Sequence, residues 1–288
     1  MKKPFKSFII DKDFDGSRVD RFLKKQFSNI PQSLFEKNFR KKNITVNSKK
    51  VKNLFKLKVN DVVDIFTEFK IDNMIKKKKI FFTSKDLDQL KKNFIFECED
   101  YCILNKPYGY ASQDGSKVKT NIIDILNTSS KNYHLVHRLD KEATGLMLIA
   151  KNRHYAKKFS EMFKFREIIK RYLVIINGKI KKNKGEIQTK DTFNGKEIVS
   201  KLYFEVISKK NNFSYIEVDL ITGRKHQIRK QFSNLGHPIV GDVKYGDKKN
   251  KVPLCLLSYK IEFEYNNKIK KYKAIIPDDF KSCLEKFF

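Results

Sequence analysis

Apolar residues recur at helical spacing near the start of the chain. They form two groups, Val19, Phe22, Leu23 and Phe27, then Leu34, Phe35 and Phe39. The stretch 28–31 separates the groups, and its last residue, Pro31, suits the first turn of a second helix. Short apolar stretches at 44–46 and 61–66 predict strands, with Asn47-Ser48 as a turn signal. Residues 1–66 are therefore predicted to form a small α/β module.

The pattern changes after this module. Residues 67–95 have few periodic apolar positions and contain the cation run Lys76-Lys77-Lys78-Lys79, which indicates a linker or irregular basic arm. From Phe96 onward, short apolar runs alternate with turn residues, at 101–104, 146–150, 172–176, 198–207, 215–220 and 254–263. Helical spacing is clearest at 120–127 and 153–165. Residues 96–288 are therefore predicted to form an α+β domain with a mainly antiparallel sheet.

Charge narrows the class of binding partner. The chain of 288 residues carries 63 Lys and Arg against 33 Asp and Glu, a net charge of +30. Such a field attracts polyanions, although a lysine excess is also typical of compositional bias across a proteome. No run of about 18 apolar residues is present, and the start MKKPFKSFIIDKDF lacks the apolar stretch of a signal peptide. We expect a cytoplasmic protein with no membrane partner.

Metal and disulfide chemistry is not indicated. The four cysteines include no Cys-x-x-Cys pair, and the five histidines form no His-Glu-x-x-His motif. We therefore expect no disulfide framework, no zinc knuckle and no catalytic metal.

Cations gather at the end of the second predicted helix. Arg40, Lys41 and Lys42 are followed by further lysines at 49, 50, 52, 56 and 58, so one basic surface is predicted to bind RNA. A solvated basic face explains the charge equally well. The arrangement resembles the RNA-binding domain named after the fourth small-subunit ribosomal protein, with Asn43 in place of the usual glycine and Val46-Asn47-Ser48 in place of Val-Asn-Gly.

Four motifs join charged or polar groups to predicted strands. They are Asn105-Lys106-Pro107-Tyr108-Gly109, His137-Arg138-Leu139-Asp140 with Thr144-Gly145-Leu146, Lys170-Arg171-Tyr172, and Gly223-Arg224-Lys225-His226-Gln227-Ile228-Arg229. In this order they resemble the RluA-type pseudouridine synthases, over almost the whole chain. Thr144 departs from the family's serine, and Arg229-Lys230-Gln231 departs from Arg-Val-His.

The resemblance implies a chemistry for these residues. Detaching uracil, turning it and rejoining it through carbon five calls for a carboxylate nucleophile or cation stabiliser, which is Asp140. Arg229 is the implied cation that keeps this carboxylate ionised in an apolar site. Tyr172 matches the tyrosine that lies against the target base and takes part in proton removal at carbon five. Arg138 matches the arginine that fills the gap left by the flipped base. Arg224 is predicted to contact RNA, and so is Lys230, whose charge at a position that departs from the family's pattern indicates an RNA-facing site.

Without the resemblance, the same residues have structural interpretations. Asp140 fits a strand-end turn or an ion pair, and Tyr172 fits a sheet position. Arg224 and Arg229 fit phosphate contacts or solvated charges. His137 and His226 are predicted to pack or to form hydrogen bonds near the site. The Lys-Pro-x-Gly motif and the later Gly241-Asp242 and Tyr245-Gly246 pairs are predicted to be structural.

The sequence thus predicts a monomeric uridine isomerase for ribosomal RNA that needs neither cofactor nor metal. Large-subunit RNA is favoured, because an amino-terminal RNA-binding module on this catalytic domain is common among the family's large-subunit enzymes. One alternative is a synthase acting on transfer RNA. Another is a non-catalytic RNA-binding factor in ribosome assembly, against which the retained Asp140, Tyr172 and Arg229 argue.

Overall fold

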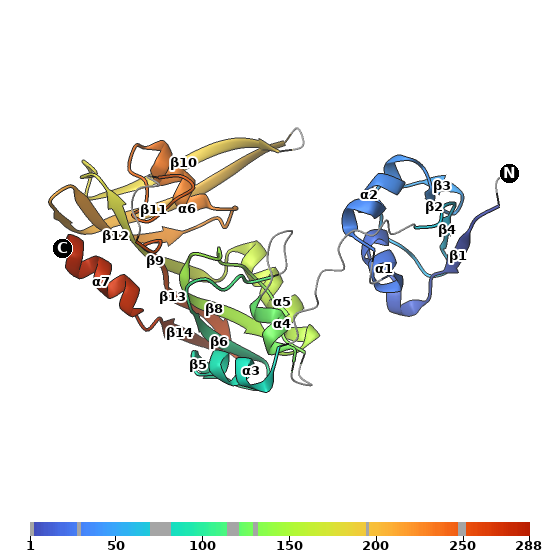
Figure 1. The fold of residues 1–288 in the computed structure, drawn as a ribbon, viewed down its shortest axis with the longest axis horizontal. Coiled ribbons are helices and arrows are strands. Elements are labelled where there is room, and N and C mark those ends of the chain that lie inside the picture. Colours follow the sequence, from blue (N-terminus) through green and yellow to red (C-terminus); the bar gives the residue numbers. More distant parts are fainter. Residues whose placement is uncertain are drawn as a thin grey trace. The chain divides into compact units, whose positions relative to one another are not determined.

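The chain divides into two compact units, Met1–Lys79 and Ile80–Phe288, in a computed structural model (Figure 1). The structure describes residues 3–27, 30–69, 82–113, 121–128, 132–193, 196–246 and 252–288. Each unit has a separate hydrophobic core. Among these residues, no helix has the length and apolar character that a bilayer crossing requires. The predicted basic run 76–79 lies outside the described residues.

The first unit joins two helices to a four-stranded sheet. Its elements are β1 (Lys6–Ile9), η1 (Lys12–Phe14), α1 (Val19–Gln26), α2 (Gln32–Arg40), β2 (Ile44–Val46), β3 (Lys49–Lys50) and β4 (Val62–Ile65). The strands are antiparallel in the order β1-β4-β2-β3. Both predicted helices and the strands at 44–46 and 61–66 are present, whereas β1 was not predicted.

Phenylalanine side chains hold this unit together. Phe22 of α1 and Phe35 of α2 are buried in one core, and Phe27 contacts the ring of Phe35. The β2–β3 turn has Asn47 at φ 49° and Ser48 at φ 60°, the left-handed pair that a tight hairpin requires. The other left-handed residue near the predicted RNA-binding surface is Lys42, at φ 64°, and not the neighbouring asparagine.

The second unit is built on a ten-stranded sheet. Its strands are β5 (Phe94–Glu97), β6 (Tyr101–Lys106), β7 (His134–Leu135), β8 (Thr144–Ala150), β9 (Ile169–Asn177), β10 (Lys184–Phe193), β11 (Lys196–Lys210), β12 (Phe213–Leu220), β13 (Leu256–Tyr265) and β14 (Lys268–Lys273). The order is β10-β11-β12-β9-β13-β8-β6-β5, with β14 on β13 and β7 on β8. Of the strand pairs described, β13 with β8 is parallel and the others are antiparallel. The predicted, mainly antiparallel α+β fold is confirmed.

Helices cover parts of this sheet (Figure 1). They are α3 (Ser84–Lys91), α4 (Ile122–Leu126), α5 (Arg153–Phe165), α6 (Gln227–Asn234) and α7 (Asp278–Phe287). Helix α5 matches the prediction for 153–165, and its N-cap is Asn152, whose side chain accepts a hydrogen bond from the Tyr155 amide at 2.9 Å. It ends where Arg166 turns left-handed, at φ 64°.

Helix α3 lies inside the interval 67–95, where the sequence pattern predicted a linker or irregular arm. Thr83 and Asp86 form a reciprocal capping box at its start. Its apolar side chains, Leu87 and Leu90, are buried in the core of the second unit. A helix this short offers too few apolar positions for its periodicity to be recognised.

The centre of the sheet is packed closely enough to require glycine. Gly145 of β8 has a φ of +100°, and a Cβ there would lie 2.3 Å from the carbonyl oxygen of Ser258 in β13. Ser258 is in turn paired with Tyr172 of β9. The glycine therefore allows three central strands to approach one another.

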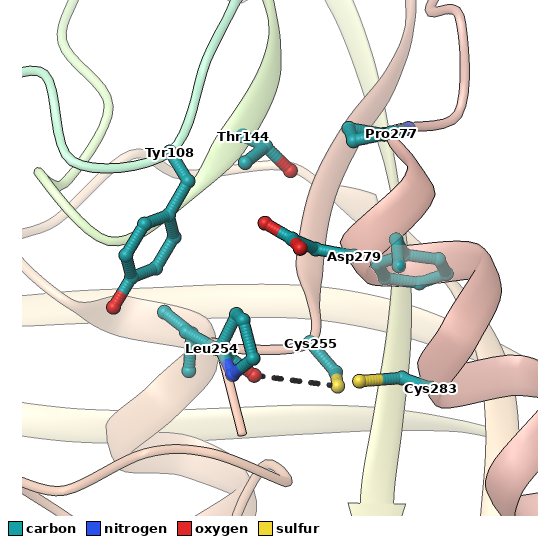
Figure 2. A pocket seen from close by; sticks show the side chains of 9 residues that line it. Tyr108, Thr144, Leu254, Cys255, Pro277, Asp279 and Cys283 are labelled. Carbon is teal, nitrogen blue, oxygen red and sulfur yellow. Dashed lines mark hydrogen bonds between the residues drawn. The ribbon is translucent and has the colours of Figure 1, made fainter. Parts of the chain in front are cut away.

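Helix α7 lies beside the segment that leads into β13. Figure 2 shows Cys283 of α7 facing Cys255, beside a cavity lined also by Tyr108 and Thr144. The four cysteines are free thiols. The cavity holds only about 10 Å³, which is the room of one water molecule. It is therefore too small to receive a substrate.

Candidate active site

A cleft of about 730 Å³ opens beside the central strands of the large sheet. Its walls come from the loop before β8, the α5–β9 corner and the β12–α6 connection. The cations that line it are Arg138, Lys164, Arg166, Lys170, Arg224, Lys225 and Arg229. Among the described lining residues, Asp140 is the one carboxylate. The cleft is large enough for a nucleoside, and its charge favours an anionic ligand.

The backbone around Asp140 is held on both sides. Ser112 Oγ donates to the carbonyl of the preceding residue at 2.7 Å and accepts from its amide at 3.0 Å. The carbonyl of the following residue accepts from Lys106 Nζ at 3.1 Å and from the Gly109 amide at 3.1 Å. The Lys-Pro-x-Gly motif, predicted to be structural, thus supports the loop that carries the candidate nucleophile.

The Asp140 side chain meets a different partner at each oxygen. Its Oδ2 accepts a hydrogen bond from Arg229 Nη1 at 3.0 Å. Its Oδ1 lies 3.5 Å from Nε2 of His226, the residue that precedes α6. The carboxylate is 15% exposed, so it faces the cleft while most of its surface is covered. The pairing of Asp140 with Arg229, implied by the resemblance, is present in the structure.

Arg229 is braced from behind by a second carboxylate. Its Nε and Nη2 donate to the two oxygens of buried Asp242 at 2.7 and 2.8 Å. Burial by itself would lower the pKa of the Arg229 guanidinium, but hydrogen bonds to Asp242 and Asp140 raise it. Burial raises the pKa of Asp242, but the hydrogen bonds that it accepts from Arg229 and from the backbone amides of Tyr245 and Lys244 lower it overall. The guanidinium is therefore a permanent cation whose orientation is fixed.

Tyr172 is nearly buried and lines the same cleft. It comes from β9, opposite Ser258 of β13. Burial raises the pKa of Tyr172 to about 12, and the charge of Asp140 acts in the same direction. The phenol is therefore protonated at neutral pH.

The two histidines predicted to pack or form hydrogen bonds near the site do so in different ways. His137 Nε2 accepts from the Leu148 amide at 2.9 Å, and its ring lies 4.5 Å from that of Phe163. Burial lowers the pKa of His137 to about 3, so it stays neutral and ties the loop to β8 and α5. His226 contacts Asp140 directly, which the sequence pattern did not indicate.

The predicted RNA contacts lie in three places. Arg138 and Arg224 are exposed and line the cleft. Lys230 is exposed on α6 but is not among the lining residues. Arg40, Lys41 and Lys42 are exposed in the first unit. There Lys42 lowers the pKa of Lys50, as expected where cations crowd together.

Two cleft cations, Lys164 and Arg166, were not singled out from the sequence, and Lys170 was named there only as part of the Lys170-Arg171-Tyr172 motif. All three belong to the α5–β9 corner and lie just before Tyr172 in the chain. The basic run around them was a usable signal, but a lysine-rich chain offers many such runs. Gln231, where the family has histidine, anchors α6 by donating to acceptors on β10 and β11 at 3.1–3.3 Å.

A metal site is not formed by the residues that the structure describes, because no three His, Cys, Asp or Glu side chains converge there. The expectation of chemistry without metal or cofactor stays a prediction.

Comparison with known proteins gives this geometry a family. Residues 100–234 match the family described as RNA pseudouridylate synthase. Ribosomal large subunit pseudouridine synthase C of Rickettsia felis is 36% identical over 256 residues, covering 81% of this chain and 83% of that protein. The enzyme of the same name from Haemophilus influenzae is 29% identical, covering 98% of this chain and 94% of that protein. The structure of human RNA Pseudouridylate Synthase Domain Containing 4 has a TM-score of 0.60 at 23% identity, covering 69% of this chain and 94% of that chain, and it shows the fold.

Fold, cleft and matches define the class as RNA pseudouridine synthase, an isomerase. Within that class, the chain belongs to the RluA-type family. The predicted enzyme class is thereby confirmed.

Proposed function

We propose that this protein isomerises uridines of large-subunit ribosomal RNA to pseudouridine, with Asp140 as the catalytic nucleophile. The observation that carries the proposal is the setting of Asp140: a carboxylate in a cation-lined cleft, bonded to an arginine that a second carboxylate holds in place. The names of the relatives from Rickettsia felis and Haemophilus influenzae support the choice of large-subunit RNA.

In the proposed mechanism, Asp140 attacks or stabilises C1′ of the target nucleotide as the bond from C1′ to N1 breaks. The detached uracil turns, and its C5 forms the new bond to C1′. The proton on C5 is then lost and N1 gains one, so the reaction is an isomerisation without net change of atoms. Arg229 holds Oδ2 of Asp140 by a hydrogen bond during the first step. The proposed role of Tyr172, which lines the cleft, is to lie against the base.

We further propose that different groups of cations bind different parts of the RNA. Arg138 fills the space of the flipped base, and Arg224 and Lys230 contact phosphates beside it. Lys164 and Arg166, across the α5–β9 corner, extend the same role. The first unit, with Arg40, Lys41 and Lys42, serves as an RNA-binding module of the type named after the fourth small-subunit ribosomal protein. Action in the cytoplasm, as a monomer without cofactor, remains a prediction from the sequence.

The two alternative functions differ in whether they need the catalytic residues. A synthase for transfer RNA needs the same Asp140, Tyr172 and Arg229, so only the substrate separates it from the proposal. A non-catalytic assembly factor has no use for a buried arginine that links two carboxylates at the cleft.

The test measures pseudouridine with purified protein on protein-free large-subunit RNA and on transfer RNA. We expect wild-type protein to modify large-subunit RNA and Asp140→Asn to be inactive, with RNA affinity nearly unchanged because cations dominate binding. Asp278→Asn, which changes an exposed carboxylate of α7, is the matched control and should be fully active. If Asp140→Asn converts uridine at the wild-type single-turnover rate, Asp140 is not the nucleophile. If the protein modifies transfer RNA alone, large-subunit RNA is not its substrate.

A further inference from the structure

The turn formed by residues 241–246 lies against both partners of Asp140. Gly241 opens it at φ +78°, where a Cβ would lie 2.2 Å from the Pro253 carbonyl oxygen. Asp242 Oδ1 accepts from the amides of Lys244 and Tyr245 at 3.0 and 3.1 Å. The sequence pattern assigned this turn a structural role only. Its contacts, however, lead directly to the candidate nucleophile.

Tyr245 touches both side chains that hold Asp140. Its hydroxyl lies 2.9 Å from His226 Nδ1. The centre of its ring lies 5.3 Å from the guanidinium carbon of Arg229. The carbonyl of Tyr245 accepts from Ser233 Oγ at 2.6 Å, so the residue is tied to α6 as well. The phenol is therefore held in a fixed position behind the imidazole.

The neighbours of His226 indicate which of its ring nitrogens carries the proton. Nε2 faces Asp140 Oδ1 at 3.5 Å, and an ionised carboxylate can only accept a hydrogen bond. A proton on Nε2 therefore gives an attractive contact, whereas a lone pair there would repel the carboxylate. With the proton on Nε2, Nδ1 is an acceptor, and the Tyr245 hydroxyl is the donor placed to meet it.

The charges around His226 agree with a neutral ring. It is faced by Asp140 from the loop before β8, by Arg229 of α6, and by Lys225 and Lys244. Burial lowers the pKa of His226, and the three cations lower it further, against the opposing effect of Asp140. At neutral pH the imidazole thus carries one proton, and its tautomer matters.

We propose that His226 is a positioning residue that holds Oδ1 of Asp140 toward the cleft, and that Tyr245 sets the tautomer in which it can do so. Arg229 fixes one carboxylate oxygen and His226 the other, so the plane of the nucleophile is defined from two sides. The proposal rests on the proposed catalytic role of Asp140. It adds Tyr245, which contacts His226 and is not among the residues that line the cleft, as a residue that acts through His226.

The kinetic test removes one hydroxyl. Tyr245→Phe keeps the ring beside Arg229 and should slow single turnover at saturating RNA by roughly threefold to tenfold, the rate equivalent of one hydrogen bond, with RNA affinity unchanged. In a His226→Ala background the same change should have no further effect. Tyr272→Phe is the matched control, because it deletes a phenol hydroxyl bonded to Tyr101 at 2.7 Å, away from the cleft lining. It should leave the rate unchanged.

A spectroscopic test reads the tautomer without any activity. In protein with ¹⁵N-labelled histidine, the His226 signals are identified by their loss in His226→Ala. We expect the proton on Nε2 in the wild type and a measurable share on Nδ1 in Tyr245→Phe. A proton on Nδ1 in the wild type would overturn the proposal. So would a double variant whose rate loss equals the product of the separate rate losses of Tyr245→Phe and His226→Ala. Activity in Asp140→Asn would instead overturn the catalytic role of Asp140, and the NMR result would still stand.

Discussion

Tyr172 keeps its hydroxyl proton at neutral pH, and this limits what it can do. Burial raises its pKa to about 12, and the nearby Asp140 adds to the effect. A protonated phenol can take up the C5 proton of the base only if it passes its own proton to a neighbour. Its ring, in contrast, can contact the base in any protonation state.

We therefore expect Tyr172→Phe to preserve RNA binding and glycosidic cleavage but to slow the later loss of the C5 proton. Product formation and adduct accumulation on RNA containing 5-fluorouridine would separate these steps. Tyr215→Phe is a suitable control, since burial also raises the pKa of Tyr215 to about 12 but the residue is not among those lining the cleft. Wild-type turnover by Tyr172→Phe would mean that the residue only packs.

Lys106 makes stability depend on pH. Burial lowers its pKa to about 7 in the folded protein, against the effects of Glu142 and Asp140. An unfolded chain keeps the ordinary lysine value of 10.5, so it binds more protons than the folded chain between these two pH values. The free energy of unfolding contributed by this group therefore rises as the pH increases from about 7 toward 10.

Lys106→Met removes this dependence. Relative to the variant, the wild type should gain on the order of 1–3 kcal/mol between neutral pH and pH ~10, measured by denaturant unfolding. Lys281→Met, at an exposed lysine of α7, should leave the wild-type pH profile unchanged. A stability difference that stays constant across this range would show that Lys106 is charged equally in both states.

At the scale of elements, the central strands depend on Gly145. A side chain there would meet the backbone of Ser258 in β13, and Ser258 pairs with Tyr172. A shift of β13 is therefore transmitted to the cleft.

We expect Gly145→Ala to cost about 2–4 kcal/mol of stability, from backbone strain plus the clash, and to lower activity. Gly236→Ala is the control, because Gly236 also has a positive φ but a Cβ added there would meet nothing within 4 Å. The control should cost about 1–2 kcal/mol from strain alone. If thermal unfolding shows the same loss of stability for Gly145→Ala and Gly236→Ala, the close approach of β13 to Gly145 makes no contribution to stability.

At the scale of the whole molecule, the two units differ in the work proposed for them. The second unit holds the cleft, while Arg40, Lys41 and Lys42 lie in the first. Helix α3 and strand β5 belong to the second unit, so a truncation should end at Lys79 and spare them. Substitutions in the full chain test the first unit without the risk of removing α3 or β5 from the core of the second unit.

Replacing Arg40, Lys41 and Lys42 with Gln should weaken binding to large-subunit RNA and reduce the slope of log affinity against log salt by about two to three. The rate on a short, saturating RNA should survive, because the cleft is untouched. Lys268, Lys281 and Lys286, exposed in the second unit, form the control set of equal charge. An unchanged slope in the first variant, or an equal drop in the control, would contradict the proposed RNA-binding module.

The amino-acid pattern predicted those features that depend on neighbours in the chain. Helix α5 and most strands of the second unit follow from local apolar periodicity, and the net charge of +30 predicts a polyanionic partner. Helix α3 and the first strand, β1, were not predicted because each has few apolar positions. The catalytic roles of Asp140, Tyr172 and Arg229 were predicted from the resemblance, since their local patterns also fit turns, sheet positions and solvated charges.

Folding then decided which side chains meet. Arg229 is 89 residues from Asp140 and 13 from Asp242, and Lys106 is 35 from the carbonyl that it holds. No periodicity encodes such contacts, because they arise when strands distant in sequence pair and a helix packs beside them. The same is true of the lowered pKa of Lys106 and of the contact between His226 and Asp140. Burial and orientation are properties of the assembled sheet and cleft, whereas the charge and the helical periods are already present in the linear chain.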